Sequence, residues 1–114
     1  MYVDGFVIPV PKDKLDDYLA FSRICGEIWK ELGAIDYVEC VADDVPYGEV
    51  TSFPRAVMAT EDEVIVFSWI TYPSKAVRDA AGPAAMADAR LKDLKVPFDG
   101  KRMIYGGFTP ALQL

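Results

Sequence analysis

Five side chains of this 114-residue chain could form one small acid–base site: Asp4, Tyr37, Glu39, Trp69 and Tyr105. Each lies in a segment predicted to be a β-strand, and alternation along those strands places all five on one face of a sheet. Carboxylates beside aromatic rings in a restricted space tend to have raised pKa values, which suits general acid–base catalysis. The alternative is a hydrogen-bonded polar network inside a packed dimer interface, with no substrate.

Glu39 is the member of this group that we expect to act as general base or ligand anchor. It lies in the middle of its predicted strand, where the backbone is held rigidly. Tyr37, Trp69 and Tyr105 would then shape the pocket and supply hydrogen-bond donors. Beyond this hypothesis the sequence identifies no catalytic residue, and it leaves the substrate open.

The complete lack of histidine removes several kinds of site. It excludes Ser-His-Asp and Cys-His nucleophiles, histidine metal ligands and the usual histidine ligand of haem iron. The chain also has no G-x-G-x-x-G run and no Walker lysine. Asp43, Asp44 and Glu49 could offer oxygens to a hard cation, but their spacing matches no calcium loop and suits a turn. We therefore predict no metal and no cofactor, although neither flavin nor haem is excluded by a motif, and the lack of histidine disfavours haem.

Two further groups of side chains, the cysteines and the residues at a predicted helix start, can be explained either by function or by structure alone. Cys25 and Cys40 are both predicted on apolar faces, Cys40 toward the helices, so we expect inert core thiols rather than nucleophiles. Ser74, Lys75 and Arg78 lie at a predicted helix N-terminus, where free N–H groups and positive charge could hold an anion. Ordinary helix capping and surface charge explain the same residues.

The overall charge limits the partners that the sequence allows. A net charge of −6 and a pI near 4.5 argue against nucleic acid and against anionic membrane surfaces, since both need basic patches. No apolar run approaches the roughly 18 residues of a membrane-spanning helix. The first residues lack the basic region of a signal peptide, so a cytoplasmic location is expected by default.

Hydrophobic periodicity and turn residues divide the chain into alternating strands and helices within a single domain, 1–114. The predicted strands cover 2–8, 34–42, 55–59, 64–72 and 101–108, and the predicted helices cover 12–33, 75–81 and 83–94. Segment 55–59 is expected to form a hairpin with the strand that follows it. The break at Gly82-Pro83 is expected because proline interrupts a helix.

Without the added hairpin strand, this order is βαββαβ and predicts an α+β, ferredoxin-like fold with an antiparallel sheet. The helices of such a fold cover one face of the sheet. Segment 64–72, however, is apolar on both faces, so a second copy of the chain is expected to cover the other face. We expect small or branched strand residues to face the helices. The larger residues, including the five candidates, should then lie on the open face.

Long blocks of the chain resemble the bacterial YbaA-like proteins, a family of unknown function. The blocks comprise Asp43–Pro46, Gly48, Val50-Thr51, Arg55–Val57, Asp62–Val64, Val66–Ile70, Tyr72–Lys75, Arg78–Ala80 and Pro97–Phe108. Together they extend over nearly the whole chain, and blocks of this length are specific. Segment 81–90 departs from the family pattern, so the course of the chain through 81–94 is left open.

The resemblance implies membership of the dimeric α/β-barrel superfamily, in which two ferredoxin-like sheets pack face to face. Relatives in that superfamily include cofactor-free monooxygenases, haem-degrading enzymes, isomerases and proteins without known activity. The implied function is a homodimer that binds a small organic molecule in a barrel-lined pocket, with its chemical transformation left open. The alternative is a non-catalytic structural or regulatory dimer whose barrel is filled by side chains.

Overall fold

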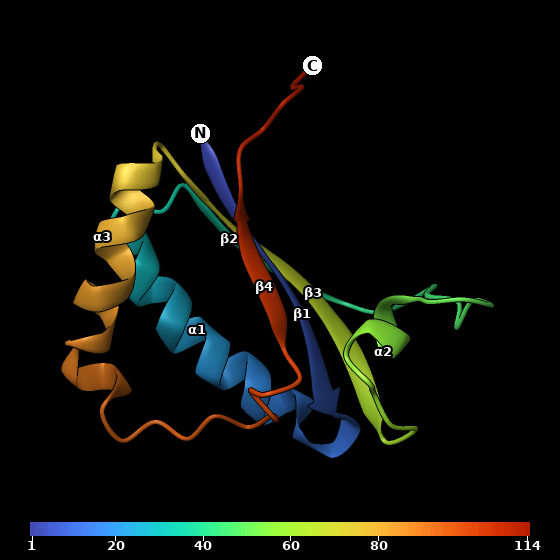
Figure 1. The fold of residues 1–114 in the computed structure, drawn as a ribbon. Helices are drawn as coiled ribbons and strands as arrows, with labels where there is room; N and C mark the ends of the chain where they lie inside the picture. Colours follow the sequence, from blue (N-terminus) through green and yellow to red (C-terminus); the bar gives the residue numbers. More distant parts are fainter.

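Four antiparallel strands form one sheet, and two longer helices lie on one of its faces (Figure 1). The computed structural model describes all residues 1–114. Its elements are β1 (Tyr2–Pro11), a 3-10 turn (Lys12–Lys14), α1 (Leu15–Glu31), β2 (Asp36–Val41), α2 (Phe53–Ala56), β3 (Glu63–Tyr72), α3 (Lys75–Met86), a second 3-10 turn (Ala89–Leu91) and β4 (Ile104–Phe108). The strand order is β2-β3-β1-β4. The α+β class and the βαββαβ-like order of the main elements are therefore confirmed.

The pairing register assigns every strand residue to a face, because directly opposite residues share one. The face toward α1 and α3, called the helix face, carries Asp4 and Phe6, which lie opposite Ile70 and Ser68. The other face, called the open face, carries Gly5, opposite Trp69. The remaining helix-face residues include Ile8, Tyr37, Glu39, Val66 and Tyr105, and the remaining open-face residues include Val3, Val7, Val38, Cys40, Phe67, Ile104, Gly106 and Phe108.

The predicted faces are right for β3 and reversed for β1, β2 and β4. Val3, Gly5, Val7, Val38, Cys40, Ile104 and Gly106 were expected to face the helices and lie on the open face, whereas Asp4, Phe6, Tyr37, Glu39 and Tyr105 lie on the helix face. The prediction failed because both faces carry apolar residues, so no polar alternation identifies the solvent side. It also assigned Asp4 and Glu39 to the open face by their size, whereas side chains of α3 and α1 bind them on the helix face.

The main core lies between the helix face and the helices. One cluster joins Ile8, Val10 and Val66 of the central strands to Tyr18 of α1. A second cluster, made of Ala34, Ile70, Tyr72 and Ala81, joins β3 to α3. Burial of these side chains fixes α1 and α3 against the sheet.

Helix α2 replaces the predicted hairpin strand over 55–59, so that prediction is wrong. Ser52 caps the helix by accepting a hydrogen bond from the Arg55 N–H at 3.3 Å, and a proline lies in the first turn. These are helix-start signals. Val57, which follows the helix, is buried against Val7 and Ile65 of the sheet. Helix α2 therefore covers one end of the face opposite α1 and α3 (Figure 1).

Helix α3 continues through Pro83, so the predicted break at Gly82-Pro83 and the helix over 83–94 are both wrong. Proline cannot donate to the Asp79 carbonyl, but Pro83 and Asp79 are exposed, so water can satisfy that carbonyl. Ala81 and Ala85, on either side of the proline, are buried and hold both halves of the helix in place. The predicted N-cap is confirmed, because Ser74 accepts a hydrogen bond from the Val77 N–H at 3.2 Å.

Strand β1 ends later, and strand β4 begins later, than the sequence predicts. Strand β1 runs on to Pro11 because β4 pairs only with 3–7, which leaves the later prolines on an open edge. Strand β4 begins at Ile104 because Lys101 and Arg102 form a turn held by Asp99. Its pairing register with β1 is continuous, so Gly106-Gly107 forms no bulge. The Tyr2 ring lies close against Gly107.

No helix of the structure combines the length and the apolar character that crossing a membrane requires.

Candidate functional site

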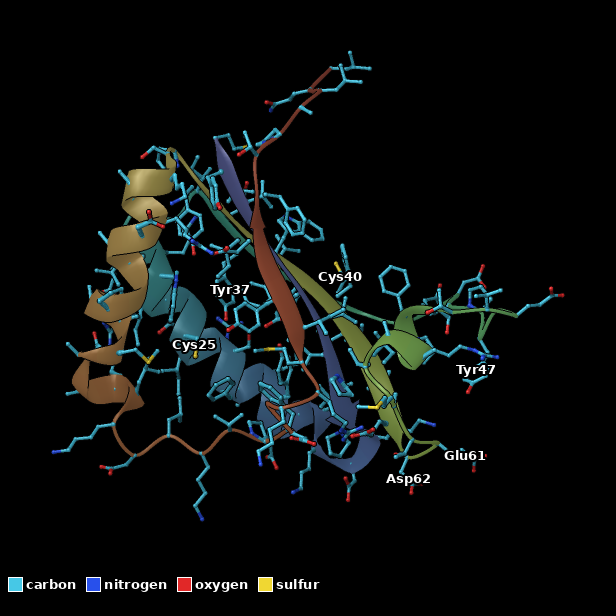
Figure 2. The ribbon with its side chains drawn as sticks, viewed as in Figure 1. Cys25, Tyr37, Cys40, Tyr47, Glu61 and Asp62 are labelled. Atoms are coloured by element: carbon cyan, nitrogen blue, oxygen red, sulfur yellow. The ribbon has the colours of Figure 1, made fainter.

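Glu39 is the centre of a hydrogen-bonded cluster between β2 and α1. The Tyr18 hydroxyl donates to both Glu39 carboxylate oxygens, at 2.9 and 2.8 Å, and the Ser22 hydroxyl donates to Oε2. The Tyr37 and Ser22 oxygens lie 3.1 Å apart. Since Ser22 uses its proton on Glu39, it accepts from Tyr37. A chain of hydroxyls therefore leads from Tyr37 through Ser22 to the carboxylate, and Figure 2 shows Tyr37 on the α1 side of the sheet.

Helix α1 contributes two hydroxyl groups to this cluster from one of its faces. Tyr18 and Ser22 are four residues apart and so lie on the same face of α1. Gly26, one turn further, is buried against Tyr37. A side-chain carbon at Gly26 would lie 2.8 Å from the Tyr37 Cδ1 atom. This glycine allows α1 to approach β2 closely enough for Ser22 to reach Glu39.

Burial determines the protonation of the groups around Glu39. Burial, with the negative charge of Glu39 as the next cause, raises the pKa of Tyr18 well above its ordinary value. Burial likewise raises the pKa of Tyr37. Both phenols therefore stay protonated at neutral pH and act as donors. The same two causes that act on Tyr18 raise the pKa of the Cys25 thiol to about 11.

A cavity of about 180 Å³ adjoins this cluster, and we call it the Glu39 cavity. Tyr18 and Phe21 of α1 form one wall, and Phe98 and Met103, from the segment before β4, form another. The Phe98 ring packs edge-on against Tyr18, with ring centres 5.6 Å apart. Glu39 is the only charged residue among those that line the cavity. The result is an apolar, largely aromatic space with one carboxylate at its edge.

A second polar cluster joins α3 to β1. Arg78 contacts the Asp4 carboxylate with Nη2 at 2.9 Å and Nε at 3.0 Å, and the Tyr72 hydroxyl donates to Asp4 at 3.0 Å. Asp79 pairs with both Arg78 and Lys75, at 3.1 and 2.9 Å. Both cations are thus neutralised within the chain. The group at the α3 N-terminus serves to hold the helix rather than to leave charge free for an anion.

The structure brings together only part of the predicted site. Tyr37 and Glu39 meet in one cluster, whereas Asp4 binds Arg78 elsewhere on the same face. Tyr105 also lies on the helix face, stacked on Phe6 and 71% exposed. Trp69 borders the Glu39 cavity, but its register position, opposite Gly5, is on the open face. The expectation that all five candidates share one face is therefore wrong.

Sequence reasoning missed Tyr18 and Ser22, the two residues that bind Glu39 directly. Hydrophobic periodicity over 12–33 places Tyr18 on the apolar side of the helix and by itself predicts only a core residue. The available signal was a hydroxyl at each of two positions four residues apart on the buried side of one helix. Polar atoms in such positions need buried partners, and a carboxylate on the adjoining strand is a fitting one.

The open face is an apolar concave surface with no helix over most of it. It forms a groove of about 680 Å³ around Gly5 and Gly106, which lie opposite each other in the sheet. The Phe108 ring rests against both glycines, and Phe67 packs against Trp69 with ring centres 5.8 Å apart. Phe67 and Phe108 are 42% and 63% exposed. Large aromatic side chains are thus left uncovered on this surface.

Cys40 lies on the open face and is exposed, which corrects the prediction that it faces the helices. Figure 2 shows Cys25 on the helix side of the sheet and Cys40 on the other side. We expect a thiol reagent to modify the exposed Cys40 of the folded chain before Cys25, which should react only after unfolding because it is buried and its pKa is raised. Mass spectrometry of the native and the denatured protein measures both. Rapid native modification of Cys25 would contradict the assigned helix orientation.

Comparison with known proteins places the chain among uncharacterised bacterial proteins. YbaA of Escherichia coli (strain K12), an uncharacterised protein, is 57% identical over 109 residues, which cover 94% of this chain and 93% of that protein. The uncharacterised YbaA of Shigella flexneri has the same identity and coverage. The family model described as "Protein of unknown function (DUF1428)" matches residues 1–100. The chain therefore belongs to the DUF1428 family.

Proposed function

We propose that the protein binds a small organic molecule in the Glu39 cavity and works as a homodimer joined through the open face. The observation that carries the binding proposal is a single carboxylate at the edge of an otherwise apolar, aromatic-walled cavity. Ligand sites commonly combine apolar walls with a few well-placed polar groups. Glu39 would fix the orientation of the ligand, and the aromatic walls would enclose its apolar part.

The volume of the cavity indicates the size of the ligand part that it would hold. An apolar protein cavity of roughly 150 Å³ accommodates benzene. At about 180 Å³, the Glu39 cavity is suited to a molecule with one ring or an aliphatic body of similar bulk. The residues that enclose it, including Phe6, Phe21 and Phe98, are only partly buried, which leaves a route of access from solvent.

Glu39 can accept one more hydrogen bond in its present arrangement. A carboxylate has about four acceptor positions. The Tyr18 hydroxyl proton is shared between both oxygens and Ser22 donates to Oε2. Oε1 can therefore accept a further hydrogen bond. Any proton transfer from a bound ligand would pass to this carboxylate, with Tyr18 and Ser22 stabilising it in place.

A thermal-shift screen with one-ring compounds tests the binding proposal, because a ligand that binds the native state raises the melting temperature. We expect hits that stabilise the unmodified protein and fail to stabilise Glu39→Gln, which keeps the side-chain shape and removes the charge. Glu27→Gln is the matched control, since Glu27 is exposed on the same helix side of the molecule. Hits that stabilise Glu39→Gln equally would contradict binding at this site.

The uncovered aromatic side chains of the open face support the homodimer. Phe67, Trp69 and Phe108 surround a hollow that another protomer can fill, and burial of apolar surface is the main driving force of association. A second sheet laid face to face on this surface would make the barrel that the family resemblance implies. Stable interfaces of standard size bury about 1,600 Å² in total.

Sedimentation at micromolar concentration tests this assembly, and the expected result is twice the 12.6 kDa chain mass. A monomer at every concentration would contradict the assembly while leaving the Glu39 cavity untouched.

The second candidate function is a structural or regulatory dimer without a ligand. One observation favours it: every buried side-chain nitrogen or oxygen already has a hydrogen-bond partner within the chain. Under this alternative the Glu39 cluster only holds α1 against β2. Glu39→Gln would then lower stability, by about 1 to 3 kcal/mol. No one-ring compound in the screen would raise the melting temperature.

A further inference from the structure

We infer that the ligand of the Glu39 cavity is a small organic cation, a primary or secondary amine on an apolar body of about one ring. This inference rests on the proposed binding function and specifies its substrate class. It follows from the charge around Glu39, the nature of the cavity walls and the contacts that Glu39 already makes.

Glu39 is the one partly buried carboxylate that lacks a positive partner. Four carboxylate residues of the chain are at least partly withdrawn from solvent: Asp4, Glu39, Glu63 and Asp88. Asp4 pairs with Arg78, Glu63 with Arg102 and Asp88 with Arg90, at 2.9, 2.6 and 2.8 Å. No lysine or arginine pairs with Glu39. Three of the four carboxylates are thus paired with an arginine, and Glu39 is not. A cationic ligand would supply the positive partner that Glu39 lacks.

The side chains that bind Glu39 cannot neutralise it. Tyr18 and Ser22 contribute neutral hydroxyls, which hold the carboxylate in position but leave its negative charge in place. An ammonium group on the ligand would add an opposite charge beside the carboxylate, whereas a hydroxyl group would only add one further hydrogen bond.

The walls of the cavity also favour a cation over an anion. Tyr18, Phe21 and Phe98 present aromatic rings, and ring faces attract positive charge. No lysine or arginine lines the cavity. An anionic ligand would meet the Glu39 charge with no compensating group. A neutral ligand would bind through the walls alone and gain little from the carboxylate.

The hydroxyl chain prepares Glu39 for such a ligand. Tyr37 donates to Ser22, and both Ser22 and Tyr18 donate to the carboxylate, so the acceptor is fixed before binding. Preorganisation of this kind lowers the entropic cost of association. The remaining acceptor capacity on Oε1 matches a single N–H of an ammonium group.

Calorimetric titration of the full-length protein with three one-ring probes of similar shape tests the inference. Benzylamine is positively charged at neutral pH, benzyl alcohol is neutral and benzoate is negatively charged. We expect benzylamine to bind at least about tenfold more tightly than benzyl alcohol, which corresponds to roughly 1.4 kcal/mol, and benzoate not to bind. In Glu39→Gln the preference for benzylamine should disappear, while Glu27→Gln should keep it.

The three probes separate failure of the inference from failure of the proposed function. Equal binding of benzylamine and benzyl alcohol to the unmodified protein would overturn the cationic class but keep a small-molecule site. Binding of none of the probes at millimolar concentration would overturn both. Benzylamine binding that Glu39→Gln leaves unchanged would place the amine on another acidic surface and overturn the inference. The comparison in the unmodified protein stands even where Glu39→Gln folds poorly.

Discussion

The Trp69→Asp variant is expected to sediment as a monomer at concentrations where the unmodified protein should form the proposed homodimer. Trp69 lies near the middle of β3 on the open face, opposite Gly5 and Val38 and beside Phe67. Aromatic residues at the centre of an interface often contribute about 2 kcal/mol or more to association, and an unpaired charge placed there adds a desolvation cost. A total of about 3 kcal/mol weakens association by about 100-fold.

Tyr105→Asp provides the matched control for this experiment. Tyr105 belongs to the same sheet but lies on the helix face, where it is 71% exposed. A charge at this position remains in water, so the dimer should persist. Dissociation by both variants would show a general loss of folding rather than a specific interface. Circular dichroism of each variant checks that the sheet has formed. A Trp69→Asp protein that is folded and still dimeric would refute the open-face interface.

The Arg78→Met variant is expected to lose about 3 kcal/mol of unfolding free energy, because removing one partner of a largely buried ion pair leaves the other charge without compensation. Arg78 is the cation of the Asp4 cluster, and the Asp4 and Arg78 side chains are 13% and 29% exposed. Methionine keeps most of the apolar stem, so the loss reports on charge rather than on packing. For a chain of this size, thermal denaturation should show a fall of the melting temperature on the order of 10 °C.

Adding Asp4→Asn to Arg78→Met should restore a large part of this loss. The double variant removes the charge that the single variant leaves unpaired, and the amide oxygen of the introduced asparagine can still accept the hydrogen bond from Tyr72. A double-variant cycle at neutral pH measures the coupling between the two residues. Additive losses from Asp4→Asn and Arg78→Met would show that the pair contributes no specific contact between α3 and β1.

The order of the elements could be predicted because their apolar periods and caps are strong local signals. The Ser74 cap and the two-sided strand over 64–72 both lie where the pattern places them. Helix α3 could not be predicted in full, because its passage through Pro83 depends on buried contacts of Ala81 and Ala85. Those contacts are tertiary, and they override the local preference for a break.

The candidate site could be predicted only in part for a related reason. Glu39 and Tyr37 were identified because strand alternation places this carboxylate and this phenol on the same face of one strand. Their face was predicted wrongly, since the register and the partners on α1 decide it. Tyr18 and Ser22 meet Glu39 only once α1 is packed on β2, and Gly26 sets how close that approach is. A single sequence does not display such a contact.

Strand β1 can form no sheet until distant parts of the chain have joined it. Its partners are β3, where Tyr2 meets Tyr72, and β4, where Val3 meets Phe108. Strand β2 pairs with β3 alone. Pairing between such remote segments makes folding slow. During synthesis, a ribosome-bound chain with only roughly its first sixty residues exposed would hold two apolar strands and no partner for either, so β3 is the segment whose arrival decides between folding and aggregation.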